Sequence, residues 1–411
     1  KVTNLIGDKN IDVTAMNWFW GLSQPGKKPE LFIEKGITGA MLGHGKEPMS
    51  DTMQAASLFF AMDGKLNQTD LSEALKTLNP VFEEVTNDDE ETLEKVVYQI
   101  GKLLLGDKVP EQAATRNELY ERIASLKTLL TGKKDAGEPE DAQDGKYQFV
   151  SLATDQSGWK DNVSQNSDKG TALRYALREL NPFAVVGADY TAHNRHGNLN
   201  LYSIENPYGM TDTYLQHRAA MLAWKNAINT ANVSYSDDFG AVNFNYTEII
   251  SAIAATSPLA PLTAAVASAI SLLPADLKGD WTYEDKSGNL SFHIDGNNLT
   301  DLSNHYVRFG SDTIDELKGG DLKDYLFGAG GNDTLNGGDG NDYMEGGKDL
   351  DTYIIKGEDT VFDSDMQGKI LFDNGGKHIQ IDRFESGGEP NPVIWHSPDR
   401  QFTAIRYGKD L

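Results

Sequence analysis

Apolar residues in the first third of the chain recur at helical spacing. Residues 90–106 place their large apolar side chains three and four positions apart and end at Gly106, and residues 116–132 do the same before Gly132. This period is that of an amphipathic helix, and a glycine directly after the last apolar position is a common helix end. The pattern predicts core-facing helices of a small bundle, after a shorter helix in 69–80.

The middle of the chain begins with a polar stretch and continues with mixed elements. Residues 132–146 are rich in Gly, Pro and charge and have no apolar period, so we interpret them as a linker. A strand-like stretch follows at 147–154, then a helix at 171–182 and a longer helix at 211–230. One face of the longer helix carries Tyr214, His217, Met221, Trp224 and Ile228.

Residues 249–273 contain no charged side chain over 25 positions, enough for a helix to span a bilayer. Pro258 and Pro261 interrupt the run, and Ala, Ser and Thr dilute its apolar character. The pattern favours a buried pair of helices. A membrane span and a membrane-touching surface segment are the alternatives.

From about residue 279 the period changes to that of strands. Residues 280–295 alternate in strand fashion around a turn at Lys286–Gly288, which predicts a hairpin. The remainder, to Leu411, is rich in Gly and Asp between short apolar stretches. This pattern is typical of β structure with tight turns.

A nine-residue repeat runs from Gly310 to Ile354. Its five copies occupy 310–318, 319–327, 328–336, 337–345 and 346–354. The sixth place always holds an aspartate, namely Asp315, Asp324, Asp333, Asp342 and Asp351. The eighth place always holds a large side chain, namely Leu317, Leu326, Leu335, Met344 and Tyr353. A fixed period of this kind predicts a stacked, repetitive fold.

Each place in the repeat has a physical role. Glycines in the first six places reach backbone angles closed to other residues, so carbonyl oxygens converge, and the aspartate adds a carboxylate. Ca²⁺ prefers such a flexible shell of oxygen atoms. An ion shared by repeats two apart pairs Asp324 with Asp342 and Asp333 with Asp351. The candidate calcium ligands are Asp324, Gly328, Gly330, Gly331, Asp333, Gly337, Asp339, Gly340, Asp342, Gly346, Lys348 and Asp351.

Metal binding and folding are expected to be one event in this repeat. Without an ion the stacked carboxylates repel one another, and the glycines favour a flexible chain. The outer copies are less regular: Gly310–Lys318 keeps only its first glycine, and Asp349 replaces the fourth glycine of 346–354. We expect these two copies to cap the stack.

Net charge and composition limit the classes of partner that this protein could bind. The net charge of -25 argues against nucleic acid, because phosphates would be repelled, and it fits a chain that binds cations. The chain has no cysteine, which suggests an exported protein stabilised by something other than disulfides. No charged-then-apolar leader follows Lys1, and the first residue is not Met, so we expect sequence upstream.

The repeat resembles the G-G-x-G-x-D-x-U-x motif of the repeats-in-toxin (RTX) family. The resemblance implies a parallel β-roll with bound Ca²⁺. It also implies secretion from a Gram-negative bacterium by a type I system that reads an uncleaved C-terminal signal. Residues 359–375 and 378–411 look like the capping strands of that family, and 378–411 would contain the export signal.

A second resemblance covers more of the chain but is less specific. The stretches 176–190, 209–224, 279–296 and 307–320 look like the region that precedes the roll in large secreted RTX proteins, some of which carry a lipase-type α/β-hydrolase domain further upstream. The stretches 1–15 and 43–67 resemble the end of such a lipase region. The resemblance implies His44 as the histidine of a Ser–Asp–His triad and Asp8 as its acid. No G-x-S-x-G nucleophile elbow occurs in the 411 residues, so this chain lacks the nucleophile for that chemistry. The alternatives are a non-enzymatic adhesin or interaction module, and a region that contacts a membrane or host surface.

The predicted fold class is α+β multidomain, with a mainly helical N-terminal region, a parallel β-roll and a β-rich C-terminal cap. The expected divisions are a mixed, then helical region 1–131, a linker 132–146, a helical domain 147–278, a hairpin lead-in 279–309, the calcium-binding roll 310–360, and a cap 361–411 with the secretion signal.

Several other residues suggest chemistry but have simpler interpretations. His193 and His196 have a spacing that could hold a metal on a helix, but their Gly and Asn neighbours favour a polar surface loop. His217 is interpreted as a buried, hydrogen-bonded core residue. Residues 59–70 echo an EF-hand but lack oxygen ligands at its first and third positions, so a helix–turn–helix is expected. Trp281 could stack on a sugar, and a core position is the simpler reading.

Overall fold

The computed structural model describes the chain in segments, which fall into two compact units. Unit 1 comprises 1–201, 218–235 and 248–273, and unit 2 comprises 202–217, 236–247 and 274–411. Within these, the described residues are 54–66, 97–103, 115–131, 147–152, 158–231, 242–245, 281–295, 304–381, 385–386, 394–396 and 403–405, except 55, 56, 64, 99, 289 and 366.

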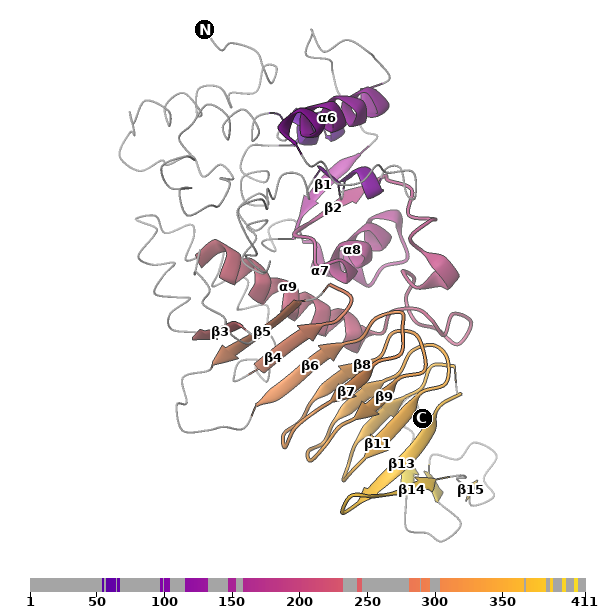
Figure 1. The fold of residues 1–411 in the computed structure, drawn as a ribbon. Coiled ribbons are helices and arrows are strands. Elements are labelled where there is room, and N and C mark those ends of the chain that lie inside the picture. Colours follow the sequence, from indigo (N-terminus) through magenta and orange to yellow (C-terminus); the bar gives the residue numbers. More distant parts are fainter. Residues whose placement is uncertain are drawn as a thin grey trace, which may run out of the picture. The chain divides into compact units, whose positions relative to one another are not determined.

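Unit 1 contains helices and one small antiparallel sheet (Figure 1). Its elements are α6 (Arg116–Thr131), β1 (Gln148–Ser151), α7 (Lys160–Val163), α8 (Asp168–Arg178), β2 (Phe183–Val186) and the short 3₁₀ helix η3 (Arg195–Gly197). Strands β1 and β2 pair in antiparallel fashion. Their Phe149 and Phe183 rings stack at 4.8 Å, and Phe59 meets both edge-on. The predicted helix at 116–132 and the predicted strand after residue 147 are therefore present.

Helix α9 (Asp212–Ala231) is the longer helix that the sequence predicts. Its residues up to His217 belong to unit 2 and those from Arg218 to unit 1. His217, Met221 and Trp224 on the predicted apolar face are 2% exposed or less. The hydrophobic spacing therefore identified the buried side of α9 correctly along the part whose side chains are described.

Unit 2 is built around two sheets. The seven-stranded sheet has the order β12-β10-β8-β6-β4-β5-β3, and the five-stranded sheet has the order β14-β13-β11-β9-β7. Together these strands are β3 (Val242–Asn245), β4 (Trp281–Asp285), β5 (Leu290–Asp295), β6 (His305–Phe309), β7 (Glu316–Lys318), β8 (Tyr325–Phe327), β9 (Thr334–Asn336), β10 (Tyr343–Glu345), β11 (Thr352–Ile355), β12 (Thr360–Phe362), β13 (Lys369–Asn374) and β14 (Lys377–Ile381).

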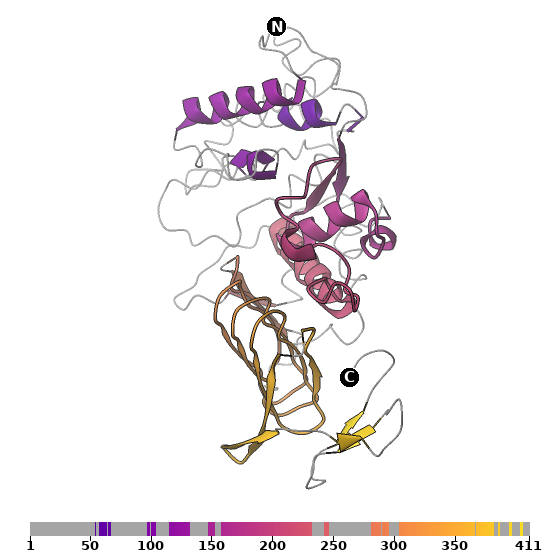
Figure 2. The ribbon, with the colours of Figure 1, turned by 90° about the vertical axis from the view of Figure 1, so that its right-hand side faces the viewer.

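The chain alternates between the two sheets and forms a β-solenoid, which confirms the predicted roll (Figure 2). Strands β7 to β11 each start at the seventh place of a repeat. Parallel pairing joins residues 18 positions apart, as in Tyr343 with Tyr325 and Thr352 with Thr334. The eighth-place side chains face inward and are fully buried, forming the core cluster Leu317, Leu326, Leu335, Met344 and Tyr353.

The parallel ladder extends beyond the five repeats at both ends. Strand β6 pairs with β8 and β4 at one end, and β12 and β13 continue the two sheets at the other. Strand β7 is the edge of its sheet, so repeat 310–318 is terminal there. Repeat 346–354 is not a cap, because β11 pairs with β9 on one side and with β13 on the other.

The C-terminal part of unit 2 is antiparallel. Strand β14 turns back on β13 and ends the parallel ladder. A separate antiparallel sheet contains β15 (Glu385–Ser386), β16 (Ile394–His396) and β17 (Thr403–Ile405). A β-rich region after the roll is therefore present, as predicted, and the predicted hairpin at 280–295 is the β4–β5 pair.

Three predicted elements lie outside the described residues. These are the short helix in 69–80, the linker 132–146 and the uncharged run 249–273. In the part of the chain that the structure does describe, no helix combines the length and the hydropathy needed to cross a membrane.

Candidate calcium sites

The turns between the strands stack into two rows. Row A is defined by the turns 310–315, 328–333 and 346–351, and row B by 319–324, 337–342 and 356–359. Neighbouring turns of a row are joined by backbone hydrogen bonds, such as Lys348 N–H to the carbonyl of Ala329 in row A. The 18-residue pairing of the strands thus places equivalent residues of successive turns next to one another.

The repeat aspartates form a ladder along each row. In row A the N–H of Asp315 donates to Oδ1 of Asp333 at 2.8 Å, and the N–H of Asp333 donates to Oδ1 of Asp351 at 2.9 Å. In row B the N–H of Asp324 donates to Oδ1 of Asp342 at 2.8 Å. The structure therefore brings together both predicted pairs.

Three of these carboxylates keep one oxygen without a partner. Oδ2 of Asp333, Asp342 and Asp351 is buried and has no hydrogen-bond partner, and each residue is at most 1% exposed. A buried, ionised carboxylate oxygen without a donor is costly, so these three oxygens are suited to bind a cation. In contrast, Oδ2 of Asp315 accepts from Ser311, and Oδ2 of Asp324 accepts from Gly320 N–H.

The same three turns share an unusual backbone. Their second and fourth residues all have positive φ: 77° and 106° at Ala329 and Gly331, 95° and 133° at Gly338 and Gly340, and 100° and 76° at Gly347 and Asp349. In the turns 310–315 and 319–324, no residue has positive φ. Left-handed conformations are costly for residues with a side chain, so Ala329 and Asp349 are held there by the fold.

The donor set of these turns fits calcium. It combines carboxylate and carbonyl oxygens, the ligands that Ca²⁺ takes in flexible sites. The described residues include no group of three or more His, Cys, Asp or Glu side chains that could hold a metal.

Burial raises the pKa of the aspartates in the ladder. It raises the pKa of Asp333 to about 8, with further contributions from the neighbouring Asp351 and Asp315. Burial also raises the pKa of Asp342 and of Asp351 to about 7, and that of Asp324 to about 6. The metal-free roll therefore favours protonated carboxylates, and a cation must replace those protons at neutral pH.

We expect a characteristic pH dependence from these shifts. The pKa of Asp333, Asp342 and Asp351 is higher in the folded roll than the usual aspartate value of 3.8. Without calcium their contribution to stability is therefore full below about pH 4 and is lost as the pH rises toward 8. His217, whose pKa burial lowers to about 3, opposes this trend below pH 6.5. Thermal unfolding between pH 6.5 and 8 should show falling stability in calcium-depleted buffer.

Calcium binding should correspondingly release protons over the same pH range. Titration calorimetry in two buffers of different ionisation enthalpy would measure this release. Binding heats that are identical in both buffers at pH 7 would contradict the raised pKa values.

Lys286 closes the N-terminal end of row A. Its Nζ lies 3.2 Å from Oδ1 of Asp315 and donates to the carbonyl of Glu316 at 2.9 Å. Burial alone would raise the pKa of Asp315, but hydrogen bonds from Ser311 and Lys286 hold it below its usual value. The first carboxylate of the row is thus neutralised by the chain itself.

Replacing Lys286 with methionine should make folding more dependent on calcium. The substitution keeps most of the side-chain volume but leaves Asp315 without its cation. We expect the calcium concentration at the folding midpoint to rise several-fold, measured by circular dichroism. Lys318→Met is the control, because Lys318 pairs with the exposed Glu316 on the surface. Equal midpoints in both variants would contradict this role of Lys286.

Two of the remaining predicted calcium ligands, Asp339 and Lys348, have side chains that contact other residues. The side chain of Asp339 pairs with Lys356 at 2.5 Å, and the ammonium of Lys348 lies 5.1 Å from the Tyr208 ring. One side-chain oxygen of Asp339, Oδ1, is therefore engaged by Lys356. The ligand roles of the glycines and of Asp339 and Lys348 stay predictions.

Sequence reasoning missed one carboxylate of row B. Oδ1 of Asp359 accepts from the N–H of Asp342 at 2.9 Å, so it continues the ladder. It lies 17 residues after Asp342, and this shortened spacing hides it from a search for a nine-residue period. The Gly357-Glu-Asp359 stretch before β12 is the sequence signal that could have identified it.

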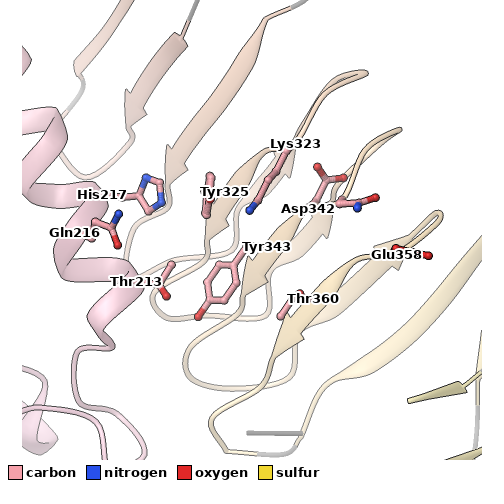
Figure 3. Close-up of a pocket in the computed structure, with 10 residues that line it drawn as sticks. Thr213, Gln216, His217, Lys323, Tyr325, Asp342, Tyr343, Glu358 and Thr360 are labelled. Atoms are coloured by element: carbon pink, nitrogen blue, oxygen red, sulfur yellow. The ribbon is translucent and has the colours of Figure 1, made fainter. Parts of the chain in front are cut away.

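A polar pocket of about 470 Å³ lies beside row B. Its walls come from the start of α9 and from strands β8, β10 and β12 with their turns (Figure 3). Asp342 and Glu358 lie on the side of the turns, and His217 and Gln216 on the side of α9. The pocket therefore opens next to a predicted calcium ligand.

The comparisons with known proteins agree with this geometry. The family model described as the RTX calcium-binding nonapeptide repeat matches residues 318–353, in four copies. Residues 318–353 are RTX calcium-binding repeats. The match supports Ca²⁺ as the ion that these repeats bind, and proteins with such repeats are typically secreted. No curated protein and no solved structure matches the chain.

The other candidate sites of the sequence have mainly structural roles. His193 is half-buried with its ring 4.8 Å from that of Tyr175, so it is not simply a surface residue. Asp63 accepts hydrogen bonds from the N–H groups of Lys65 and Phe149, and so fixes the start of β1. Trp281 is 2% exposed, which confirms a core position.

His217 and the predicted catalytic pair are the remaining candidates. His217 is buried as predicted, but its Nδ1 has no hydrogen-bond partner, so the predicted hydrogen bonding is wrong for that atom. His44 and Asp8, the predicted catalytic pair, lie outside the described residues.

Proposed function

We propose that this chain is the calcium-dependent folding and export region of a secreted bacterial exoprotein. The observation that carries the proposal is the coincidence, in three turns, of positive φ at the second and fourth places with a buried, unpartnered aspartate oxygen. Such a roll stays unfolded while calcium is scarce and folds where calcium is abundant. A chain that must leave the cell unfolded benefits from that difference.

Type I export from a Gram-negative cell is the second part of the proposal. It is supported by the RTX repeats and by the β-rich region after them, where the resemblance places the signal. Its test is secretion of a reporter fused to residues 279–411 in a bacterium that carries a type I exporter. Export should be lost when 361–411 are removed. Equal secretion of the truncated fusion would contradict the signal's location.

The resemblance to RTX lipases supports an upstream esterase-type activity, with His44 and Asp8 as triad members. No nucleophile elbow is present, so we expect the purified chain to leave short- and long-chain fatty-acyl esters intact in millimolar calcium. Hydrolysis that disappears in a folded His44→Ala variant would instead show a complete esterase site here. A chain that folds with calcium but hydrolyses nothing would be a folding and export module.

A further inference from the structure

The two outer faces of the roll differ in chemistry. The seventh and ninth places of each repeat point outward, because the eighth points into the core. On the five-stranded sheet these outward residues are polar or charged for the most part, namely Glu316, Lys318, Thr334, Asn336 and Thr352. On the seven-stranded sheet they form what we call the aromatic face: Phe309, Tyr325, Phe327, Tyr343 and Phe362.

Neighbouring strands supply the rings of the aromatic face. The ring of Phe309 on β6 stacks on that of Phe327 on β8 at 4.9 Å and 9° between planes. Tyr343 on β10 lies 5.9 Å from Phe327. No single strand carries enough of this surface to bind anything, so the face exists only when the strands are aligned.

Residues 202–217, which we call the strap, cover this face within unit 2. The ring of Tyr214 meets Phe309 and Phe327 edge-on, at 5.5 Å each. The ring of His217 lies 3.8 Å from that of Tyr325, and the two side chains are adjacent in Figure 3. Edge-on aromatic pairs are favourable beyond the area they bury.

The strap also supplies a polar anchor. Glu345 is the one acidic residue among the outward positions of β8, β10 and β12. Its Oε2 accepts from Oγ1 of Thr211 at 2.8 Å and from the hydroxyl of Tyr343 at 3.0 Å. A carboxyl buried among rings requires such donors, so undocking the strap would remove one of these two.

We propose that calcium controls the docking of the strap, and that the strap in return raises the calcium affinity of the roll. The row B turns 319–324 and 337–342, which hold the predicted ligands Asp324 and Asp342, directly precede strands β8 and β10, and these strands carry most of the aromatic face. A metal-free roll cannot align those strands, so the strap loses its binding surface. Linkage makes the effect reciprocal, because a contact made only in the calcium-bound state must favour calcium binding by the same free energy.

The first test measures calcium binding after substitutions of strap residues that are not themselves predicted calcium ligands. Thr211→Val removes the hydrogen bond to Glu345, and Tyr214→Ala removes the edge-on contacts. Each should weaken calcium binding by about fivefold or more in calorimetric titrations, the lower range of typical coupling. Tyr214→Phe keeps the ring and should restore most of the affinity.

The matched control for Thr211→Val is Thr334→Val, the same change on the outer face of the five-stranded sheet. It should leave the calcium affinity unchanged. Circular dichroism in saturating calcium verifies that each variant folds. Wild-type affinity in both Thr211→Val and Tyr214→Ala would overturn the proposal, as would an equal loss in Thr334→Val.

The second test follows the strap directly by hydrogen exchange. Peptides from 202–217 should be protected in millimolar calcium and should exchange rapidly after calcium removal. The same loss should occur in calcium in an Asp333→Ala variant, whose change lies in row A. Helix α8 (Asp168–Arg178) is the internal reference and should keep its protection. A strap that stays protected without calcium would overturn the proposal, and so would an equal loss in α8.

Discussion

In calcium-free buffer at pH 8 we expect the solenoid over residues 305–374 to lose its strand structure, and we expect millimolar calcium to restore it. The reason is the three buried aspartate oxygens without donors, on Asp333, Asp342 and Asp351. Ionised carboxylates of one row repel one another when no cation lies between them. Far-UV circular dichroism during a calcium titration measures the transition.

Magnesium provides the control for this experiment. It demands a near-ideal octahedron and loses its water reluctantly, so a roll of carbonyl oxygens suits it poorly. We expect magnesium at the same concentration to leave the chain without roll structure. A full β signal in the presence of chelator would show that the carboxylates do not need a cation.

Gly338→Ala should destabilise the calcium-bound roll by about 3 kcal/mol, because two costs add. Gly338 has a φ of 95°, where a residue with a side chain is strained, and a Cβ at this place would collide with the carbonyl of Gly320 in the adjacent turn of row B. Since both groups are backbone, neither can move aside cheaply. Chemical denaturation in saturating calcium would measure the loss.

The opposite substitution at the equivalent place is the matched control. Ala329 occupies the second place of the preceding repeat and has a φ of 77°. Ala329→Gly should stabilise the roll by about 0.5 kcal/mol, since relief of the left-handed strain exceeds the entropy that glycine loses. A loss of stability in Ala329→Gly, or none in Gly338→Ala, would contradict the assigned backbone geometry.

The sequence was sufficient to predict the roll because each place of the repeat has one structural task. Each nine-residue repeat needs its eighth side chain in the core and its sixth, an aspartate, in a turn. Coils of two repeats, or 18 residues, meet both needs, and this is the pairing observed between β8 and β10. The pairing of Asp333 with Asp351 follows from the same count. A strict period thus encodes long-range contacts directly.

The ends of the roll could not be predicted in this way because they leave the period. Lys286 lies on the turn between β4 and β5, and nothing in its local sequence indicates that its ammonium reaches Asp315. Asp359 joins row B one residue earlier than the repeat requires. These contacts depend on tertiary structure, and a periodic search does not detect them.

The strap shows a different limit of prediction from the sequence. The aromatic residues at the seventh and ninth places, such as Tyr325 and Phe327, are visible in the sequence and mark one outer face as apolar. Their partner Tyr214 is more than a hundred residues away and carries no repeat. The existence of a covered face was therefore predictable from the pattern, whereas the segment that covers it was not.

The most direct test of the calcium assignment is calorimetric titration of calcium into the calcium-depleted chain and into a variant with Asp333, Asp342 and Asp351 all changed to alanine. The three unpartnered oxygens predict that the wild-type chain binds calcium and gains β structure, and that the variant does neither at millimolar calcium. Calcium binding by the variant with the stoichiometry and affinity of the wild-type chain would contradict the account.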